Sequence, residues 1–132
     1  MNTNNKKFFK FMTDQEVNEF LESIGGLKSA YYPDRIITSR MFECGSGWNK
    51  LICDLIKDLI NIGWNKEIGQ IKEKFGTLRF YPGGCTEEQW KLIGEAERKS
   101  ATICEYCGTT ENVKLYTDGW YTTECLSCRN KK

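Results

Sequence analysis

The stretch "QIKEKFGTLRFYPGGC", residues 70–85, combines cations, aromatic residues and two turn signals and predicts a β-hairpin. Two short strands extend over residues 68–81 and meet near Phe75-Gly76, and a Pro-Gly-Gly sequence ends the second strand. In that strand Leu78 and Phe80 alternate with polar residues. Because neighbouring side chains of a strand point to opposite faces, we expect one face of the hairpin in the core and the other in solvent.

The solvent face of this hairpin gathers three cations and one aromatic ring, which are Lys72, Lys74, Arg79 and Tyr81. Guanidinium and ammonium groups bind phosphate, and a tyrosine ring stacks on a base. The face is therefore a candidate site for a nucleotide or for single-stranded nucleic acid. Charged side chains are also the ordinary outer surface of a half-buried strand, so the sequence leaves both interpretations open.

The strongest predicted helix spans residues 46–62, and its apolar stripe is wide enough to cover the inner face of a sheet. Gly63 suits the position just after a helix, and Trp64 can pack back onto it. The residues that recur at helical spacing are Trp48, Leu51, Ile52, Leu55, Ile56, Leu59 and Ile60.

Two further helices are predicted from capping boxes, in which a threonine is followed three residues later by Glu or Gln. The box at Thr13 begins a helix that a glycine pair ends at residues 25–26, and the box at Thr86 begins one that runs to about Ala101. In the later helix, Trp90, Ile93 and Ala96 are expected to point inward.

The segment between the first two helices has no clear period, and we predict only a short strand at residues 35–39. The chain as a whole divides into a disordered or loosely ordered N-terminus at residues 1–12, a domain at residues 13–101, and a tail at residues 102–132. The expected class is α+β, with a small antiparallel sheet packed on two or three helices and a C-terminal four-cysteine zinc ribbon docked on it.

The tail carries the most specific pattern in the chain, a C-x2-C-G sequence, then sixteen residues, then a second C-x2-C. This spacing is typical of a structural zinc site, in which four thiolates close the tetrahedron. Strands at residues 113–117 and 120–123, joined at Asp118-Gly119, would form a hairpin that brings the pairs together. The predicted Zn²⁺ ligands are Cys104, Cys107, Cys125 and Cys128.

Composition narrows the function classes. The chain has no histidine, no P-loop and no nucleophile-elbow motif, so we expect that it is not an enzyme. A net charge of +1 disfavours a dedicated duplex-DNA binder. No signal peptide or run of 18 apolar residues is present, which favours a cytoplasmic protein without membrane contact.

The remaining cysteines, Cys44, Cys53 and Cys85, are interpreted as free or packed thiols.

The segment "IKEKFGTLRFY", the Gly47-Trp48 pair upstream of it and the C-terminal cysteine pairs resemble a family of small, uncharacterised bacterial and phage proteins. Members share a "VKEKFG-x-LRFY" segment and a C-x2-C…C-x2-C zinc-ribbon tail. The resemblance covers residues 44–128 and implies a prokaryotic or phage accessory protein, without implying a biochemical activity.

Two non-enzymatic functions follow as hypotheses. In the first, the cations and ring of the hairpin bind a nucleotide signal or single-stranded nucleic acid, in a role that would suit phage counter-defence. In the alternative, the chain is an inhibitor or adaptor that binds a host protein through Trp120 and Tyr121 of the zinc-ribbon hairpin, since Trp and Tyr are frequent interface anchors. The partner's identity and the oligomeric state do not follow from the sequence.

Overall fold

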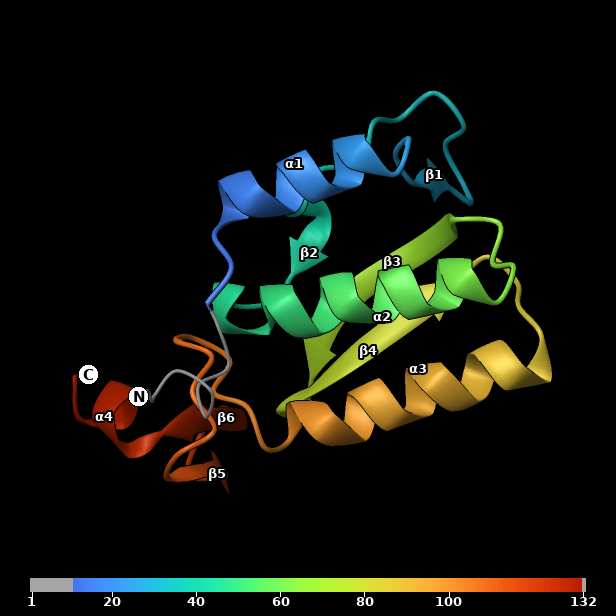
Figure 1. The fold of residues 1–132 in the computed structure, drawn as a ribbon. Helices are drawn as coiled ribbons and strands as arrows, with labels where there is room; N and C mark the ends of the chain where they lie inside the picture. The colour runs from blue at the N-terminus through green and yellow to red at the C-terminus, as the bar shows by residue number, and fades with distance from the viewer. Residues whose placement is uncertain (1–10, 132) are drawn as a thin grey trace, which may run out of the picture.

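The computed structural model describes residues 11–131 and has the predicted α+β class, with helices packed on a small sheet (Figure 1). Met12 already packs against the core, whereas positions 1–10 of the predicted disordered N-terminus lie outside the described residues. The α-helices are α1 (Asp14–Ser23), α2 (Asn49–Asn61), α3 (Glu87–Ser100) and α4 (Leu126–Asn130), with short 3-10 turns η2 (Ser39–Met41) and η3 (Ser46–Trp48). The strands are β1 (Lys28–Ser29), β2 (Phe42–Glu43), β3 (Glu67–Lys74), β4 (Thr77–Pro82), β5 (Val113–Tyr116) and β6 (Thr122–Cys125).

The predicted hairpin is present as β3 and β4, which pair antiparallel from Lys74↔Thr77 to Ile68↔Pro82. Phe75 and Gly76 form its two-residue turn with φ angles of 55° and 86°. Positive φ at both positions is the geometry of a type I′ turn, whose twist matches that of the strands. Leu78 and Phe80 are fully buried, which confirms the predicted inner face.

The sheet is mixed and not antiparallel throughout, which corrects the predicted topology. β1 and β2 both pair parallel with β3, at Lys28↔Glu67 and at Phe42↔Ile71, while β4 pairs with β3 antiparallel. These two-residue strands lie within the segment that shows no period. Strands this short carry too little alternation to be recognised locally, because long-range pairing with β3 defines them.

The strand predicted at residues 35–39 is wrong. Among the described residues, Ile36 forms only an isolated bridge with Lys28, and η2 begins at Ser39. The Thr38 hydroxyl accepts from the amide of Arg40 at 3.3 Å, and the Asn18 side chain accepts from the amide of Ser39 at 2.8 Å. Side chains therefore satisfy backbone donors that a strand would offer to a neighbour.

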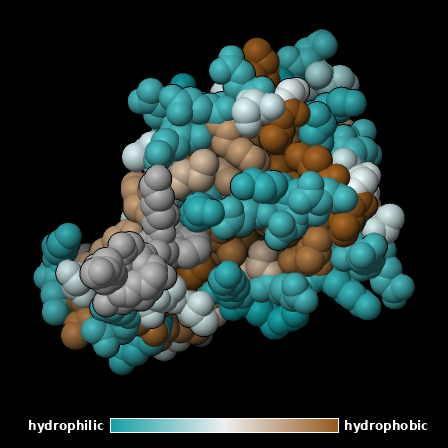
Figure 2. All heavy atoms as spheres, in the orientation of Figure 1, coloured by the Kyte–Doolittle hydropathy of each residue, from teal (hydrophilic) through white to brown (hydrophobic). Residues whose placement is uncertain are grey.

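α2 and α3 lie side by side over β3 and β4 (Figure 1) and bury the predicted stripe of α2, with Ile60 partly buried. Both capping boxes are confirmed, at Thr13 and Thr86. Trp64 is buried in the core, where its ring centroid lies 5.8 Å from that of Phe80 in β4. On the helical side, hydrophilic residues cover the outward sides of the helices and hydrophobic residues show in the seams between them (Figure 2).

Trp90 does not point inward as predicted, because it is 48% exposed. The inward stripe of α3 begins one residue earlier, at Gln89, and continues through Ile93 and Ala96. The Gln89 side chain donates to the carbonyl oxygen of Ile62 at 3.2 Å and closes the end of α2, so a polar residue occupies the position where an apolar one was expected. The longest described helix, α3, has 14 residues, too few to cross a bilayer.

The cysteine-bearing tail packs tightly on the turn at residues 45–48. The amide of Gly47 donates to the carbonyl oxygen of Glu105 at 2.7 Å, and the amide of Gly45 donates to its carboxylate at 2.9 Å. The indole nitrogen of the fully buried Trp48 donates to the carbonyl oxygen of Ile103 at 2.9 Å. Three hydrogen bonds from one turn thus fix the segment that carries the first cysteine pair.

Replacing Gly47 by alanine tests this close approach. A Cβ at Gly47 would collide with the Cys104 carbonyl oxygen and with the Glu105 backbone. We expect Gly47→Ala to lower the free energy of unfolding of the zinc-loaded protein by about 3 kcal/mol, measured by chemical denaturation. Gly84→Ala is the matched control, because a Cβ there meets no atom of the described residues within 4 Å. Equal stability of the two variants would contradict the described packing.

Candidate metal centre

The four tail cysteines meet at one point, as the spacing of the two pairs predicts. The sulfur atoms of Cys104, Cys107, Cys125 and Cys128 all lie within 4.8 Å of one another. In a tetrahedral site with Zn–S bonds of about 2.3 Å, neighbouring sulfurs are about 3.8 Å apart. Cys107 and Cys125 are separated by 3.7 Å, which fits this value and is far longer than a disulfide bond of about 2.0 Å.

The first cysteine pair lies on a tight turn. The amide of Gly108 donates to the carbonyl oxygen of Cys104 at 2.9 Å, and the amide of Cys104 donates to the carbonyl oxygen of Thr109 at 2.9 Å. Gly108 has a φ of 81°, as expected for the residue that closes such a turn. Cys104 is fully buried and Cys107 is exposed, so the pair reaches from the core to the surface.

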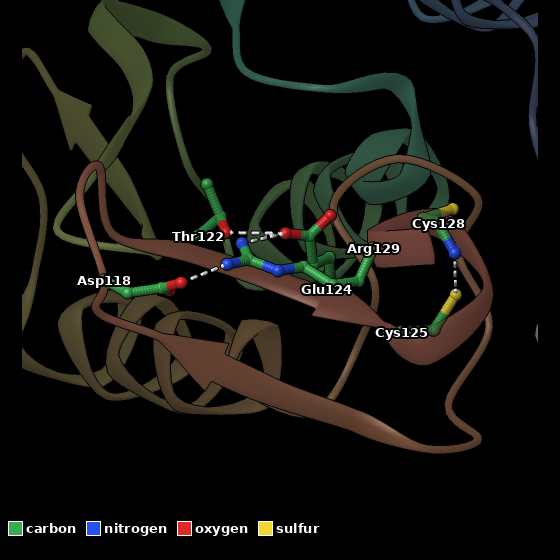
Figure 3. Close-up of polar contacts among 6 residues, drawn as sticks. All are labelled: Asp118, Thr122, Glu124, Cys125, Cys128 and Arg129. Atoms are coloured by element: carbon green, nitrogen blue, oxygen red, sulfur yellow. Dashed lines mark hydrogen bonds and ion pairs between the residues drawn. The ribbon is translucent and has the colours of Figure 1, made fainter. Parts of the chain in front are cut away.

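The second pair lies where β6 passes into α4. Cys125 is the N-cap of α4, and its sulfur accepts from the amide of Cys128 at 3.3 Å (Figure 3). Burial alone would raise the pKa of Cys125, but hydrogen bonds from the Cys128 amide and from the neighbouring thiols lower it below its ordinary value. A lowered pKa favours the thiolate, which is the form that binds a metal.

The hairpin between the pairs is present, with β5 ending at Tyr116 and β6 beginning at Thr122. The second strand was expected at residues 120–123 and therefore starts two residues later than predicted. Trp120 remains outside the strand and is 81% exposed, so it does not cover the cysteines. Residues 117–121 instead form a loop, called here the ribbon tip, at the end of the β5–β6 hairpin (the ribbon).

A salt-bridged arginine fixes the ribbon tip to α4. Arg129 donates to Asp118 at 2.6 Å and to Glu124 at 3.1 Å (Figure 3). Its guanidinium also lies 4.3 Å from the ring centroid of Tyr116. Glu124 is fully buried and also accepts from the Thr122 hydroxyl at 2.9 Å. The pair with Glu124 is buried at the carboxylate, whereas the Arg129–Asp118 pair that reaches the tip is exposed, so the network links the tip to α4 by geometry more than by a large free energy.

The donor set fits one Zn²⁺ ion. Four sulfurs at tetrahedral spacing satisfy the preference of Zn²⁺ for thiolates and leave no open position for water or substrate. The ion would therefore supply folding free energy and rigidity, as structural zinc does, and no catalytic chemistry. The cysteine cluster is thus consistent with the predicted Zn²⁺ cofactor and its predicted structural role.

The candidate ligand residues share one face of the hairpin. The register pairs Lys72 with Arg79 and Gln70 with Tyr81, and Lys74 lies two residues beyond Lys72 on the same side. Ile71, Leu78 and Phe80 occupy the opposite, buried side. The four predicted residues therefore lie together on the outer face of β3–β4, away from the helices.

A cavity joins the two groups of residues that the sequence singles out separately. It has a volume of about 510 Å³ and lies between the end of β3 and the ribbon tip. Its lining includes Lys72 and Lys74 of the ligand group and Trp120 and Tyr121 of the interface group, and also Glu73 and Phe75. From the sequence, Phe75 is predicted only as part of the turn. The missed signal is an exposed aromatic at a turn position that favours Asn, Asp or Gly.

The other cysteines lie outside the cluster. Cys53 is buried in α2, while Cys44 and Cys85 are half-buried and pack against the core. Burial raises the pKa of Cys53 to about 12, and the nearby Asp54 adds to the shift. Burial likewise raises the pKa of Cys44 to about 12, with a further contribution from the Glu105 carboxylate. Both are therefore protonated at neutral pH.

Comparison with protein-family models, with curated proteins and with solved structures finds no match. Of the features on which the family resemblance rests, the structure supports the C-terminal four-cysteine cluster.

Metal content tests the centre. We expect the purified protein to carry about one equivalent of zinc by elemental analysis, and Cys104→Ser to lose most of it because three thiolates leave the tetrahedron open. Cys85→Ser is the control, since Cys85 lies outside the cluster, and should keep the metal. Acidification should release the zinc, because protons compete with the metal for the thiolates. Equal zinc in both variants would exclude this cluster as the site.

Thiol labelling tests the raised pKa values of Cys44 and Cys53. The thiolate is the reactive form, and with a pKa of about 12 roughly one thiol in 10⁵ is ionised at pH 7. A maleimide or disulfide reagent should leave both unlabelled in the folded protein, and the labelling rate should rise as the pH increases towards that pKa. Rapid labelling of either residue at pH 7, mapped by mass spectrometry, would contradict their burial.

Proposed function

We propose that the protein is a zinc-stabilised, non-enzymatic binding module that holds a phosphate-bearing ligand, a nucleotide or single-stranded nucleic acid, on the outer face of β3–β4. The proposed contacts are phosphate binding by Lys72, Lys74 and Arg79 and base stacking by Tyr81. Capture of a nucleotide signal by such a module is one way in which a small phage protein would act in counter-defence.

The observation that carries this proposal is the cation pair formed by Lys72 and Arg79. They are directly opposite one another on neighbouring strands, where like charges are destabilising. Within residues 11–131, the side chain of neither residue takes part in an ion pair. Glu43 carries a negative charge beside Lys72 in register, and within the described residues its carboxylate accepts from the Gln70 side chain at 3.0 Å without forming an ion pair with Lys72. A bound phosphate would relieve the repulsion between the two cations.

The cavity that Lys72 and Lys74 line, together with Glu73, supports a ligand that has an aromatic part. Phe75 and Tyr121 line it and meet edge to face, with ring centroids 6.1 Å apart. Lys74 lies 5.6 Å from the ring centroid of Phe75. The cavity volume of about 510 Å³ falls in the range of small-molecule sites, about 300–1,000 Å³. Cations and rings around one hollow match a phosphate joined to a base.

The zinc centre would serve this site by positioning one wall of the cavity. Trp120 and Tyr121 belong to the ribbon tip, which Arg129 holds through Asp118. The ribbon also reaches the hairpin turn directly, because the Thr123 hydroxyl donates to the carbonyl oxygen of Gly76 at 2.6 Å. Folding of the ribbon around the metal would therefore bring the tip next to β3.

The alternative function is binding of a host protein through the ribbon tip, and the 81% exposure of Trp120 favours it. An exposed tryptophan beside Tyr121 has the composition of an interface anchor. The two functions differ in what Lys72 and Arg79 do. A protein partner that docks on the tip is expected to depend on Trp120 and to be insensitive to the cation pair.

Charge reversal of the cation pair tests the proposal. The double variant Lys72→Glu, Arg79→Glu should weaken binding of a fluorescent oligothymidylate by about 100-fold or more, because two charge-assisted contacts are lost. Fluorescence anisotropy measures the affinity, and wild-type affinity should also fall with rising salt.

The matched control is Lys57→Glu, Lys91→Glu, which makes the same change in net charge on the exposed helical side. It should bind like wild type, and thermal melting should show both variants folded. If both double variants weaken binding equally, the loss of affinity depends on net charge alone, and the outer face is excluded as the binding site.

A further inference from the structure

We propose that the ligand of the outer face is a single-stranded nucleic acid of about four nucleotides, bound along β3, and not a free nucleotide. This inference rests on the proposed function and narrows its ligand class. It follows from the distribution of exposed aromatic residues, which lie at both ends of the β3–β4 outer face with cations between them.

The first end of the face lies near Gly69. A Cβ at Gly69 would lie 3.3 Å from Cε2 of Tyr31, so the Tyr31 ring lies against β3 at this position. The Tyr31 side chain is nevertheless 72% exposed to solvent. The register shift between Ile68 and Gln70 explains why Gly69 and Gln70 both avoid the core. Tyr32 lies beside Tyr31 and carries the Arg35 guanidinium 4.5 Å from its ring centroid. One end of β3 thus offers an exposed ring and a nearby cation.

The middle of the face carries the cations. Tyr81 is opposite Gln70, and the next outward-facing pair along the strands is Lys72 with Arg79. Tyr81 is 39% exposed, so part of its ring is open to a stacked base. The two nearby carboxylates, Glu43 and Glu73, accept hydrogen bonds from the Gln70 side chain and from the amide of Gly76, and they keep their negative charge. Within the described residues neither forms an ion pair with Lys72 or Arg79. A single-stranded nucleic acid that lies along β3 would place its phosphate groups over Lys72 and Arg79.

The second end is the cavity at the ribbon tip. Phe75, which is 63% exposed, has a φ of 55°, a left-handed conformation that is uncommon for a residue other than glycine, asparagine or aspartate. Asparagine would fit this turn position better, so the phenylalanine is not explained by the turn. Its ring lines the cavity with Trp120 and Tyr121, where a terminal base would stack.

Length separates this ligand from a mononucleotide. From Gly69 to Phe75 the strand advances six residues, about 20 Å at 3.3 Å per residue. One nucleotide cannot contact both ends, whereas about four nucleotides is the smallest site size of single-strand binding modules. A duplex is disfavoured, because its bases are stacked inside and cannot reach the aromatic side chains.

A length series tests the inference with the full-length, zinc-loaded protein. Oligothymidylates and oligouridylates of one, two, four and eight nucleotides are titrated by anisotropy or by competition. Affinity should rise steeply up to about four nucleotides and then change little. A duplex of the same length should bind more weakly. The DNA and RNA series show which single strand is preferred.

Three aromatic variants locate the strand on the face. Tyr31→Ala should weaken binding of the four-nucleotide probe by about 5- to 150-fold, the cost of one lost stacking contact. The two-nucleotide probe is expected to occupy the ribbon-tip cavity, so the same variant should leave its affinity unchanged. Trp120→Ala should weaken binding of both the two- and the four-nucleotide probe. Phe75→Asn should also weaken binding of both probes, without lowering the melting temperature of the protein. Trp90→Ala, an exposed aromatic on α3, is the control.

The outcomes distinguish the inference from the proposed function. Length-independent affinity that still requires Lys72 and Arg79 would overturn the single-strand inference and leave a nucleotide site standing. Wild-type binding by all three aromatic variants, or a preference for duplex, would also overturn it. Absence of binding to every probe would remove the proposed function as well.

Discussion

The contact between the first cysteine pair and the turn at residues 45–48 is the constraint on which the arrangement of the molecule depends. Two amides of this turn donate to Glu105, and the buried indole of Trp48 donates to the carbonyl oxygen of Ile103. A glycine at position 47 is required, because any side chain would collide with the Cys104 carbonyl oxygen. The cysteine ribbon is therefore held against the domain at the start of α2, the helix that organises the core.

This contact decides what lies beside the outer face of β3–β4. With the ribbon fixed next to α2, the Thr123 hydroxyl reaches the carbonyl oxygen of Gly76, and the ribbon tip closes one side of a cavity at the end of β3. The four-cysteine cluster and the cations thus belong to one arrangement, although they are far apart in the sequence. The metal would give rigidity to a small ribbon, and the ribbon would give the hairpin an aromatic wall.

Much of this arrangement follows from local sequence signals. The alternation of Leu78 and Phe80, the two capping boxes and the cysteine spacing each predict what is present, because each is a property of neighbouring residues. The parallel pairing of β1 and β2 with β3 could not be predicted, since two-residue strands carry no period. The prediction that Trp90 points inward is wrong because the polar Gln89 takes the inward position, where its side chain donates a hydrogen bond to the carbonyl oxygen of Ile62 at the end of α2. The roles of Phe75 and Tyr31 depend on tertiary neighbours that the sequence does not reveal.

The most direct test of the central claim is to map the bound strand on the protein. Backbone amide chemical shifts of the zinc-loaded protein would be recorded by NMR during titration with a four-nucleotide single strand. We expect the largest changes in β3, in β4 and in the ribbon tip at residues 117–121. Changes confined to α2 and α3, on the opposite side of the sheet, would contradict it.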